Sequence, residues 1–136
     1  MLEHKNVRSF CDFHIRNSDI DEHSVVSAYA SYGFDACLSE MYPALIGGAE
    51  LHIIEEDIRL DLVRLNRYFE DNGITHAFMT TQVARQFATE IDNHSLKYLL
   101  TGGERLVPLE PPKNFELING YGPTAVSYTH LRAHET

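Results

Sequence analysis

The sequence of 136 residues has few basic residues, few cysteines and no long apolar run, and each scarcity excludes a class of protein. The 11 Lys and Arg residues against 20 Asp and Glu leave a formal net charge of −9. This charge argues against nucleic acid or an anionic membrane as a partner, because both attract basic patches. No apolar stretch approaches the roughly 20 residues that a membrane span requires. Residues 1–7 lack the apolar core of a signal peptide, so we expect a cytoplasmic protein.

Cysteine and histidine do not form a recognisable metal-binding pattern. Cys11 and Cys37 stand without a CxxC motif, which favours two free thiols in a reducing compartment, with a disulfide as the alternative. His52 and His76 lie in apolar segments and are expected to be satisfied strand residues. His130 and His134 have the i, i+4 spacing of a metal pair but not the HExxH arrangement, so we predict no metal site.

The apolar pattern indicates alternating strands and helices. Hydrophobic residues make up 43% of the chain and charged residues 23%, which are values of a globular protein. Strands are predicted at 25–30, 51–54, 74–79, 96–100 and 115–118, and helices at 6–15, 36–46, 62–72 and 81–91. Asp61 is the predicted cap of the third helix, which carries Leu62, Val63, Leu65 and Phe69 on one side, and Gly73 ends it. The predicted fold class is α/β, with a mostly parallel sheet and flanking helices.

Three turn-rich or glycine-rich loops follow predicted strands, at 32–35, 101–104 and 119–124. Parallel strands place their carboxyl ends at one edge of the sheet, where ligands usually bind. We therefore expect the three loops to leave the sheet at one common edge and to form a site there.

The segment Asn-Gly-Tyr-Gly-Pro-Thr at 119–124 has two interpretations. Its glycines allow a backbone to approach a ligand closely, Tyr121 can offer a flat face to a heterocycle, and Thr124 can hydrogen-bond an anionic oxygen. The same residues are equally typical of a tight turn. Neither of the phosphate-binding patterns GxxxxGK[ST] and GxGxxG occurs in the chain, and no GxSxG motif supports a catalytic serine.

Two further features are open in the same way. Thr101-Gly-Gly-Glu104 can hold a ligand against the backbone, but Gly-Gly pairs are common in ordinary loops. Asp35 stands at a junction between strand and helix, where its carboxylate can pair with a ligand ammonium group or cap the helix that begins at Ala36.

Taken in order, these motifs resemble the amino-acid adenylation domain of nonribosomal peptide synthetases, within the adenylate-forming (AMP-binding) ligases. The resemblance lies in Phe34-Asp-Ala36, Ile74-Thr-His-Ala77, Leu100-Thr-Gly-Gly-Glu104 and Asn119-Gly-Tyr-Gly-Pro-Thr124, and covers residues 1–124. It implies that the chain is an incomplete part of the large N-terminal region of such an enzyme.

The resemblance implies an amino-acid pocket. Asp35 would bind the α-ammonium group of the substrate, a charge pair that is strong in a desolvated pocket. The substrate-binding residues it implies are Asp35, Ala36, Ser39, Phe78, Leu100, Gly102 and Gly120. Among the residues that line the side-chain pocket only Ser39 is polar, so an apolar amino acid is favoured: valine, isoleucine or leucine first, an aromatic one next.

The resemblance also implies a nucleotide site and partners. Tyr121 would lie against adenine, and Thr124 would reach the α-phosphate. The nucleotide-binding residues it implies are Gly102, Gly103, Glu104, Asn119, Gly120, Tyr121 and Thr124. The complete protein would use ATP and Mg²⁺, and would pass the acyl group to the phosphopantetheine of a peptidyl carrier domain beside a condensation domain. No catalytic residue and no metal ligand is assigned to this chain.

Some positions depart from the family pattern. The family's phosphate loop would precede Met1, and Ala125 stands where the family has a glutamate associated with Mg²⁺. Residues 125–136 match nothing in the family and are expected to be a non-native tail, similar to a translated sequencing adapter. We expect the chain alone to be inactive. The alternatives are a ligase fragment for a fatty or aryl acid, which would give Asp35 no ammonium to bind, and a non-catalytic α/β binding module.

Overall fold

The computed structural model describes residues 3–31, 33, 36–105, 107–121 and 129–132, with the backbone alone for 121 and 129–132. Its helices are α1 (His4–Asn17), α2 (Ala36–Gly47), α3 (Leu62–Asn72) and α4 (Thr81–Glu90). Its strands are β1 (Val25–Ala28), β2 (Glu50–Ile53), β3 (His76–Thr80), β4 (Tyr98–Gly102), β5 (Glu116–Tyr121) and β6 (Thr129–Arg132).

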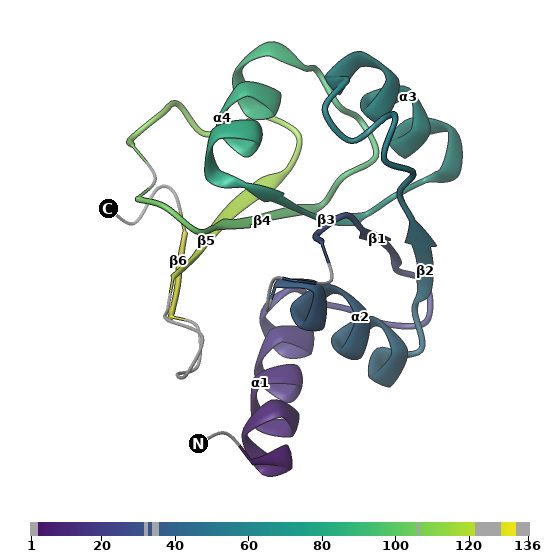
Figure 1. The fold of residues 1–136 in the computed structure, drawn as a ribbon, viewed down its shortest axis with the longest axis vertical. Coiled ribbons are helices and arrows are strands. Elements are labelled where there is room, and N and C mark those ends of the chain that lie inside the picture. The colour runs from purple at the N-terminus through teal and green to yellow at the C-terminus, as the bar shows by residue number, and fades with distance from the viewer. Residues whose placement is uncertain (1–2, 32, 34–35, 106, 122–128, 133–136) are drawn as a thin grey trace.

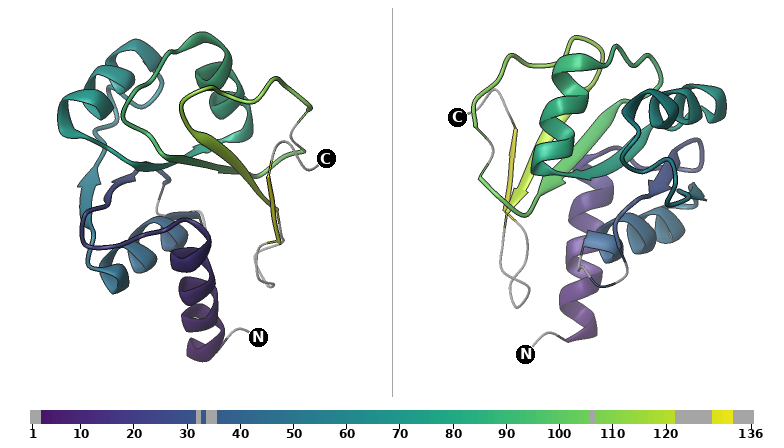
Figure 2. Two further views of the ribbon diagram at one scale, coloured as in Figure 1. Left: turned by 180° about the vertical axis from the view of Figure 1, so that it is seen from behind. Right: turned by 45° about the horizontal axis from the view of Figure 1, so that its top comes forward.

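The strands form one mostly parallel sheet in the order β2-β1-β3-β4-β5-β6. Strands β1 to β5 are parallel to their neighbours, and β6 is antiparallel to β5. Helices α3 and α4 lie on one side of the sheet, and α1 and α2 on the other (Figure 1; Figure 2). The predicted α/β class with flanking helices is confirmed. Residues 125–136 were expected to be a non-native tail outside the fold, so β6 has no counterpart among the predicted strands.

Helix α3 is formed by the local signals that predicted it. The Asp61 side chain accepts a hydrogen bond from the Arg64 N–H at 3.2 Å, which caps the first turn. Gly73 ends the helix at φ 65°, a left-handed conformation that glycine adopts without strain. Leu65 and Phe69 are fully buried, whereas Val63 is 62% exposed. The placement of Val63 on the buried side was wrong, because a single residue step rotates it about 100° away from Leu62.

Several strand boundaries differ from the prediction for identifiable reasons. Strand β1 ends at Ala28 because the next two N–H groups bond to a side chain of α2. Strand β4 is shifted by two residues, since Thr101 and Gly102 continue the ladder with β3. The N–H of Leu96 instead donates to the side chain of Asn93 at 2.7 Å. The end of β1 therefore depended on a side chain 10 and 11 residues away, whereas the start of β4 depended on a contact three residues away.

The main core lies between the sheet and helices α3 and α4. Its cluster of buried side chains joins the helices to neighbouring strands and includes Leu65, Phe69, Met79, Phe87, Leu99 and Leu117. Phe69 and Phe87 meet with ring centroids 6.0 Å apart. Cys11 and Cys37 are buried and are not joined in a disulfide, as predicted. None of the helices in the described ranges is long and apolar enough to cross a membrane.

Candidate functional site

The carboxyl ends of strands β1, β3, β4 and β5 lie at one edge of the sheet, here called the carboxyl edge. This follows from their parallel pairing, which was predicted. Of the three segments singled out in the sequence, 101–104 and 119–124 begin within the last residues of β4 and β5 at this edge, and 32–35 follows the end of β1. In parallel sheets ligands bind beyond this edge, so it is the candidate site.

Four of the predicted substrate-binding residues share one face of the sheet near the carboxyl edge. Phe78 pairs with Leu100, and Leu100 pairs with Ile118, so these positions face the same side. Gly102 and Gly120 lie two residues further along β4 and β5 and therefore belong to that face as well. Phe78 and both glycines are buried, and Leu100 is partly buried. Three neighbouring strands thus assemble one apolar surface.

Gly102 has a structural reason to be glycine. A Cβ atom on Gly102 would lie 2.4 Å from the carbonyl oxygen of Gly120, a distance at which backbone would have to move. Gly103 differs, because its φ of 107° disfavours other residues although no atom lies within 4 Å of a Cβ placed there. The Gly-Gly pair therefore combines close strand packing with a left-handed turn.

Helix α2 brings two more predicted pocket residues to the sheet. Ala36 and Ser39 are both buried, at 5% and 4% exposure. The Ser39 hydroxyl donates a hydrogen bond to the Ala36 carbonyl oxygen at 2.7 Å, within its own helix. The Ser39 hydroxyl is therefore already used as a donor within the helix, so this side of the pocket offers a mainly apolar surface.

The loop after β4 is held by a residue that sequence analysis missed. The buried Thr81 hydroxyl donates to the Glu104 carbonyl at 3.2 Å, and the Glu104 N–H donates to the Thr81 oxygen at 3.3 Å. Thr81 is the first residue of α4, so this helix fixes the turn that contains Gly103. From the sequence, a threonine at the start of a helix is interpreted as a helix cap. Its contact with a residue 23 positions away cannot be recognised from the neighbouring sequence.

Two buried oxygens at the carboxyl edge have no hydrogen-bond partner among the described residues. They are Oγ1 of Thr101 and Oδ1 of Asn119, on residues that pair across β4 and β5. A buried polar atom without a partner is costly, so such atoms indicate where a ligand can supply one. Asn119 was predicted to border an adenine base, whose exocyclic amine is a donor suited to Oδ1.

The binding roles of all the predicted site residues remain predictions, and three of these residues lie outside the described side chains. Asp35 and Thr124 lie outside the described residues, and for Tyr121 only the backbone is described, at the end of β5. Their roles toward the ammonium group, the α-phosphate and the base remain predictions.

Glu40 is the second residue that sequence analysis missed. It is 4% exposed, and it accepts hydrogen bonds from the backbone N–H groups of Tyr29 and Ala30 beyond the end of β1. Burial raises the pKa of this carboxyl group to about 7, although the two N–H donors and Arg59 oppose the rise. It is the one charged residue in the apolar helix α2, and this isolation was the available sequence signal.

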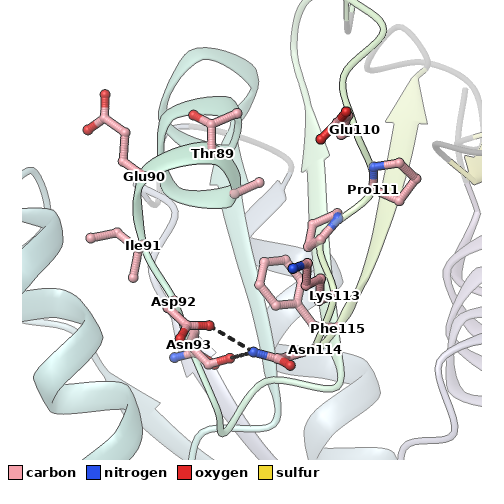
Figure 3. A pocket seen from close by; sticks show the side chains of 12 residues that line it. Thr89, Glu90, Ile91, Asp92, Asn93, Glu110, Pro111, Lys113, Asn114 and Phe115 are labelled. Carbon is pink, nitrogen blue, oxygen red and sulfur yellow. Dashed lines mark hydrogen bonds between the residues drawn. The ribbon is translucent and has the colours of Figure 1, made fainter.

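The opposite edge of the sheet, here called the amino edge, has pockets of its own that do not coincide with the predicted site. One is lined by the segments 88–93 and 110–115, which lead into β4 and β5. Figure 3 shows Asn114 there, with its amide donating to Asp92 Oδ1 and to the Asn93 carbonyl, both at 3.0 Å. Because Asn114 is satisfied by Asp92 and Asn93, this part of the pocket needs no ligand to complete its hydrogen bonds. No cluster of three metal-binding side chains occurs in the described ranges.

Comparison with known proteins identifies relatives of this architecture. The family model described as AMP-binding enzyme matches residues 1–134. Surfactin synthase subunit 1 of Bacillus subtilis is 48% identical over 124 residues, which cover 91% of this chain and 3% of that protein. Bacitracin synthase 1 of Bacillus licheniformis is 41% identical over 124 residues, 91% of this chain and 2% of that protein. The chain thus spans a few per cent of the length of these relatives.

Solved structures share the fold at low sequence identity. The adenylation domain AlmE of Vibrio cholerae, in complex with glycyl-adenosine-5'-phosphate, has a TM-score of 0.81 at 20% identity, covering 96% of this chain and 27% of that chain. The fused adenylation-PCP di-domain NpsA-ThdA from Klebsiella oxytoca has a TM-score of 0.68 at 21% identity, covering 82% of this chain and 23% of that chain. The family match over nearly the whole sequence, on the fold that the sequence predicted, leads to one conclusion: this chain belongs to the AMP-binding enzymes.

Proposed function

We propose that the chain is the part of an amino-acid adenylation domain that forms most of the amino-acid pocket and one side of the adenine site, within a nonribosomal peptide synthetase. The observation that carries the proposal is the shared sheet face of Phe78, Leu100, Gly102 and Gly120 at the carboxyl edge. The relatives named as surfactin and bacitracin synthases support the assignment to peptide synthesis.

The proposed reaction has two steps. A carboxylate oxygen of the amino acid attacks the α-phosphorus of Mg²⁺-bound ATP, the bond from that phosphorus to the bridging oxygen breaks, and pyrophosphate leaves. The thiol of a carrier-domain phosphopantetheine then loses its proton and attacks the acyl carbon, and AMP leaves as the thioester forms. Condensation domains of the same synthetase would use this thioester. Positioning and charge stabilisation account for most of the catalytic work in such phosphoryl chemistry.

The residues of this chain would bind and orient the substrates. Asp35 pairs with the α-ammonium group, and the apolar face with Ala36 and Ser39 accepts an aliphatic side chain. Asn119 receives a hydrogen bond from the adenine amine at its free Oδ1, which supports the fit of a nucleotide at this place. Tyr121 covers the base, Gly103 and Glu104 border the nucleotide, and Thr124 reaches the α-phosphate.

The test is a chimera in which residues 1–124 of this chain replace the matched segment in surfactin synthase subunit 1; it is called the chimera below. Amino-acid-dependent exchange of pyrophosphate into ATP should occur with valine, isoleucine or leucine, and not with fatty or aryl acids. Asp35→Ala should lower kcat/KM for amino acids at least about 100-fold, as expected for loss of a desolvated charge pair. Exchange with non-amino acids that survives Asp35→Ala would favour the other class of ligase.

The 136-residue chain itself is proposed to be inactive. It contains no glycine-rich phosphate loop of either common pattern, so nothing in its sequence grips the β- and γ-phosphates. Pyrophosphate exchange catalysed by this chain alone would overturn this part of the proposal.

A further inference from the structure

Glu40 is a buried acid whose hydrogen bonds join two segments beside the amino-acid pocket. Its Oε1 accepts from the Ala30 N–H at 2.7 Å, and its Oε2 accepts from the Tyr29 N–H. The residue is 4% exposed, so these bonds are shielded from water. Bonds from N–H groups to a shielded carboxylate are stronger than neutral ones, and losing one partner strands the other.

The two N–H groups need this partner because the sheet does not supply one. Pairing of β1 with β2 runs to Ala28, whose carbonyl accepts from the Ile54 N–H at 3.1 Å. Strand β1 pairs with β3 at Val26 and His76, and just before this pair the Thr75 N–H donates to the Val25 carbonyl at 2.8 Å. Tyr29 and Ala30 therefore follow the last rung of the ladder, where buried N–H groups otherwise cost free energy. Glu40 thus supplies hydrogen-bond acceptors for two residues beyond the end of β1.

The side chain of Tyr29 fixes the same point from a second direction. Tyr29 is 4% exposed, and its hydroxyl donates to the Arg59 carbonyl at 3.0 Å. The Arg59 guanidinium lies 5.0 Å from the centre of the Tyr29 ring, in cation–π geometry. Arg59 also favours the ionised form of Glu40. The end of β1 is thus held by its backbone to α2 and by its ring to the segment before α3.

Glu40 stands one helical turn after Ala36 and directly after Ser39, both predicted pocket residues. Positions four apart share a face of a helix, so Ala36 and Glu40 lie along the side of α2 that meets the sheet. The chain leaves the end of β1 at Ala30 and enters α2 at Ala36. A contact from Glu40 to Ala30 therefore fixes both ends of the connection that carries Asp35 in the sequence.

We propose that Glu40 is a positioning residue for the amino-acid pocket, which it aligns by fastening the end of β1 to the first turns of α2. The inference rests on the proposed function for the identity of the pocket. It predicts that loss of the Glu40 carboxylate weakens binding of the amino acid more than binding of ATP.

The contact itself is tested on the 136-residue chain by NMR hydrogen exchange. In Glu40→Gln one acceptor oxygen is replaced by an amide NH₂, so at least one of the Tyr29 and Ala30 amides should exchange at least about 10-fold faster while Val26 is unchanged. Glu56→Gln is the matched control, the same change at an exposed position. Exchange at Tyr29 and Ala30 that stays within about twofold of the wild type would overturn the inference.

A measurement on the wild type keeps the test decisive if the variant does not fold. The amide ¹⁵N shifts of Tyr29 and Ala30 should titrate together with the Glu40 carboxyl carbon, near its pKa of about 7. Arg59 is the charged side chain that lowers this pKa, and the Tyr29 phenol is the titratable neighbour whose own pKa Glu40 raises. Shifts at Tyr29 and Ala30 that ignore the titration of Glu40 would overturn the contact.

The functional consequence is tested in the chimera. Glu40→Gln should raise KM for the amino acid at least about 10-fold and change KM for ATP by less than about twofold. Equal rises in both constants would show a general structural role and overturn the inference. Failure of the wild-type chimera to activate any amino acid would instead overturn the proposed function, and the hydrogen-exchange result would still decide whether Glu40 holds the end of β1.

Discussion

The two edges of the sheet treat their buried polar groups differently. At the amino edge, the Thr75 hydroxyl exchanges two hydrogen bonds with the backbone of Val25, at 2.9 and 3.1 Å, and His76 Nε2 meets the Ser18 carbonyl at 2.6 Å. At the carboxyl edge, Thr101 Oγ1 and Asn119 Oδ1 are buried without a partner among the described residues. These hydroxyl and imidazole groups at the amino edge are satisfied by the protein itself, whereas the two oxygens at the carboxyl edge are suited to a hydrogen bond from a ligand.

The largest expected effect concerns the close packing of the carboxyl edge. Gly102→Ala should lower the free energy of unfolding by about 3 kcal/mol, because its Cβ meets the backbone oxygen of Gly120 and not a side chain that can move aside. Urea denaturation followed by circular dichroism measures the change.

Gly103→Ala is the control for that prediction. It should cost only about 1 kcal/mol, since its penalty comes from a positive φ in open space. Equal losses for the two variants would contradict the account of the Gly102–Gly120 approach.

The buried acid and the buried histidine should give opposite pH dependences. The pKa of Glu40 is raised to about 7 from 4.5, so the folded state binds more protons than the unfolded state between these values. Its contribution to stability is therefore present below pH 4.5 and is lost as the pH rises toward 7, by at most about 3 kcal/mol. Unfolding free energies measured across this range should fall more steeply for the wild type than for Glu40→Gln.

His76 has the reverse sign. Burial lowers the pKa of His76, so the unfolded state binds the proton more tightly, and stability is lost as the pH falls below 6.5. His76→Asn should flatten that part of the profile. If the unfolding free energies of Glu40→Gln and of the wild type changed in parallel across the whole pH range, the loss of stability between pH 4.5 and 7 could not be assigned to Glu40.

The sharpest comparison makes the same substitution, threonine to valine, at both edges. Thr75→Val should lower the free energy of unfolding by about 2 kcal/mol, since it leaves the Val25 N–H without its acceptor, whereas the Val25 carbonyl keeps the bond from the Thr75 N–H. Thr101→Val removes a hydroxyl without a partner and should be neutral or stabilising by up to about 1 kcal/mol. Chemical denaturation measures both. A loss at Thr101 as large as that at Thr75 would remove the distinction between the edges.

Local signals in the sequence predicted most helices and strands of the fold. The boundaries that were predicted wrongly depend mostly on contacts between distant segments. The caps at Asp61 and Gly73 and the apolar periods identified α3 without any tertiary information. The end of β1 depended on Glu40, 11 residues beyond Tyr29, and was placed two residues too late. The periodicity of apolar residues does not predict that an acidic side chain will bind backbone N–H groups of another element.

The candidate site was predictable to a similar degree. The alternation of strand residues, once the strands are parallel and in register, suffices to bring Phe78, Leu100, Gly102 and Gly120 to one face. The role of Gly102 against the Gly120 carbonyl, and of Thr81 against Glu104, depends on ångström-scale distances that composition and spacing do not encode. Those residues became interpretable only with the backbone in place.

The most direct test of the central claim compares one asparagine at each edge. In the chimera, Asn119→Ala removes the buried oxygen that awaits a donor, and should lower kcat/KM for ATP at least about 10-fold. Asn114→Ala, at the amino edge and bonded to Asp92 and Asn93, should leave the same constant within about twofold of wild type. An unchanged constant in Asn119→Ala, or an equal loss in Asn114→Ala, would contradict a nucleotide site at the carboxyl edge.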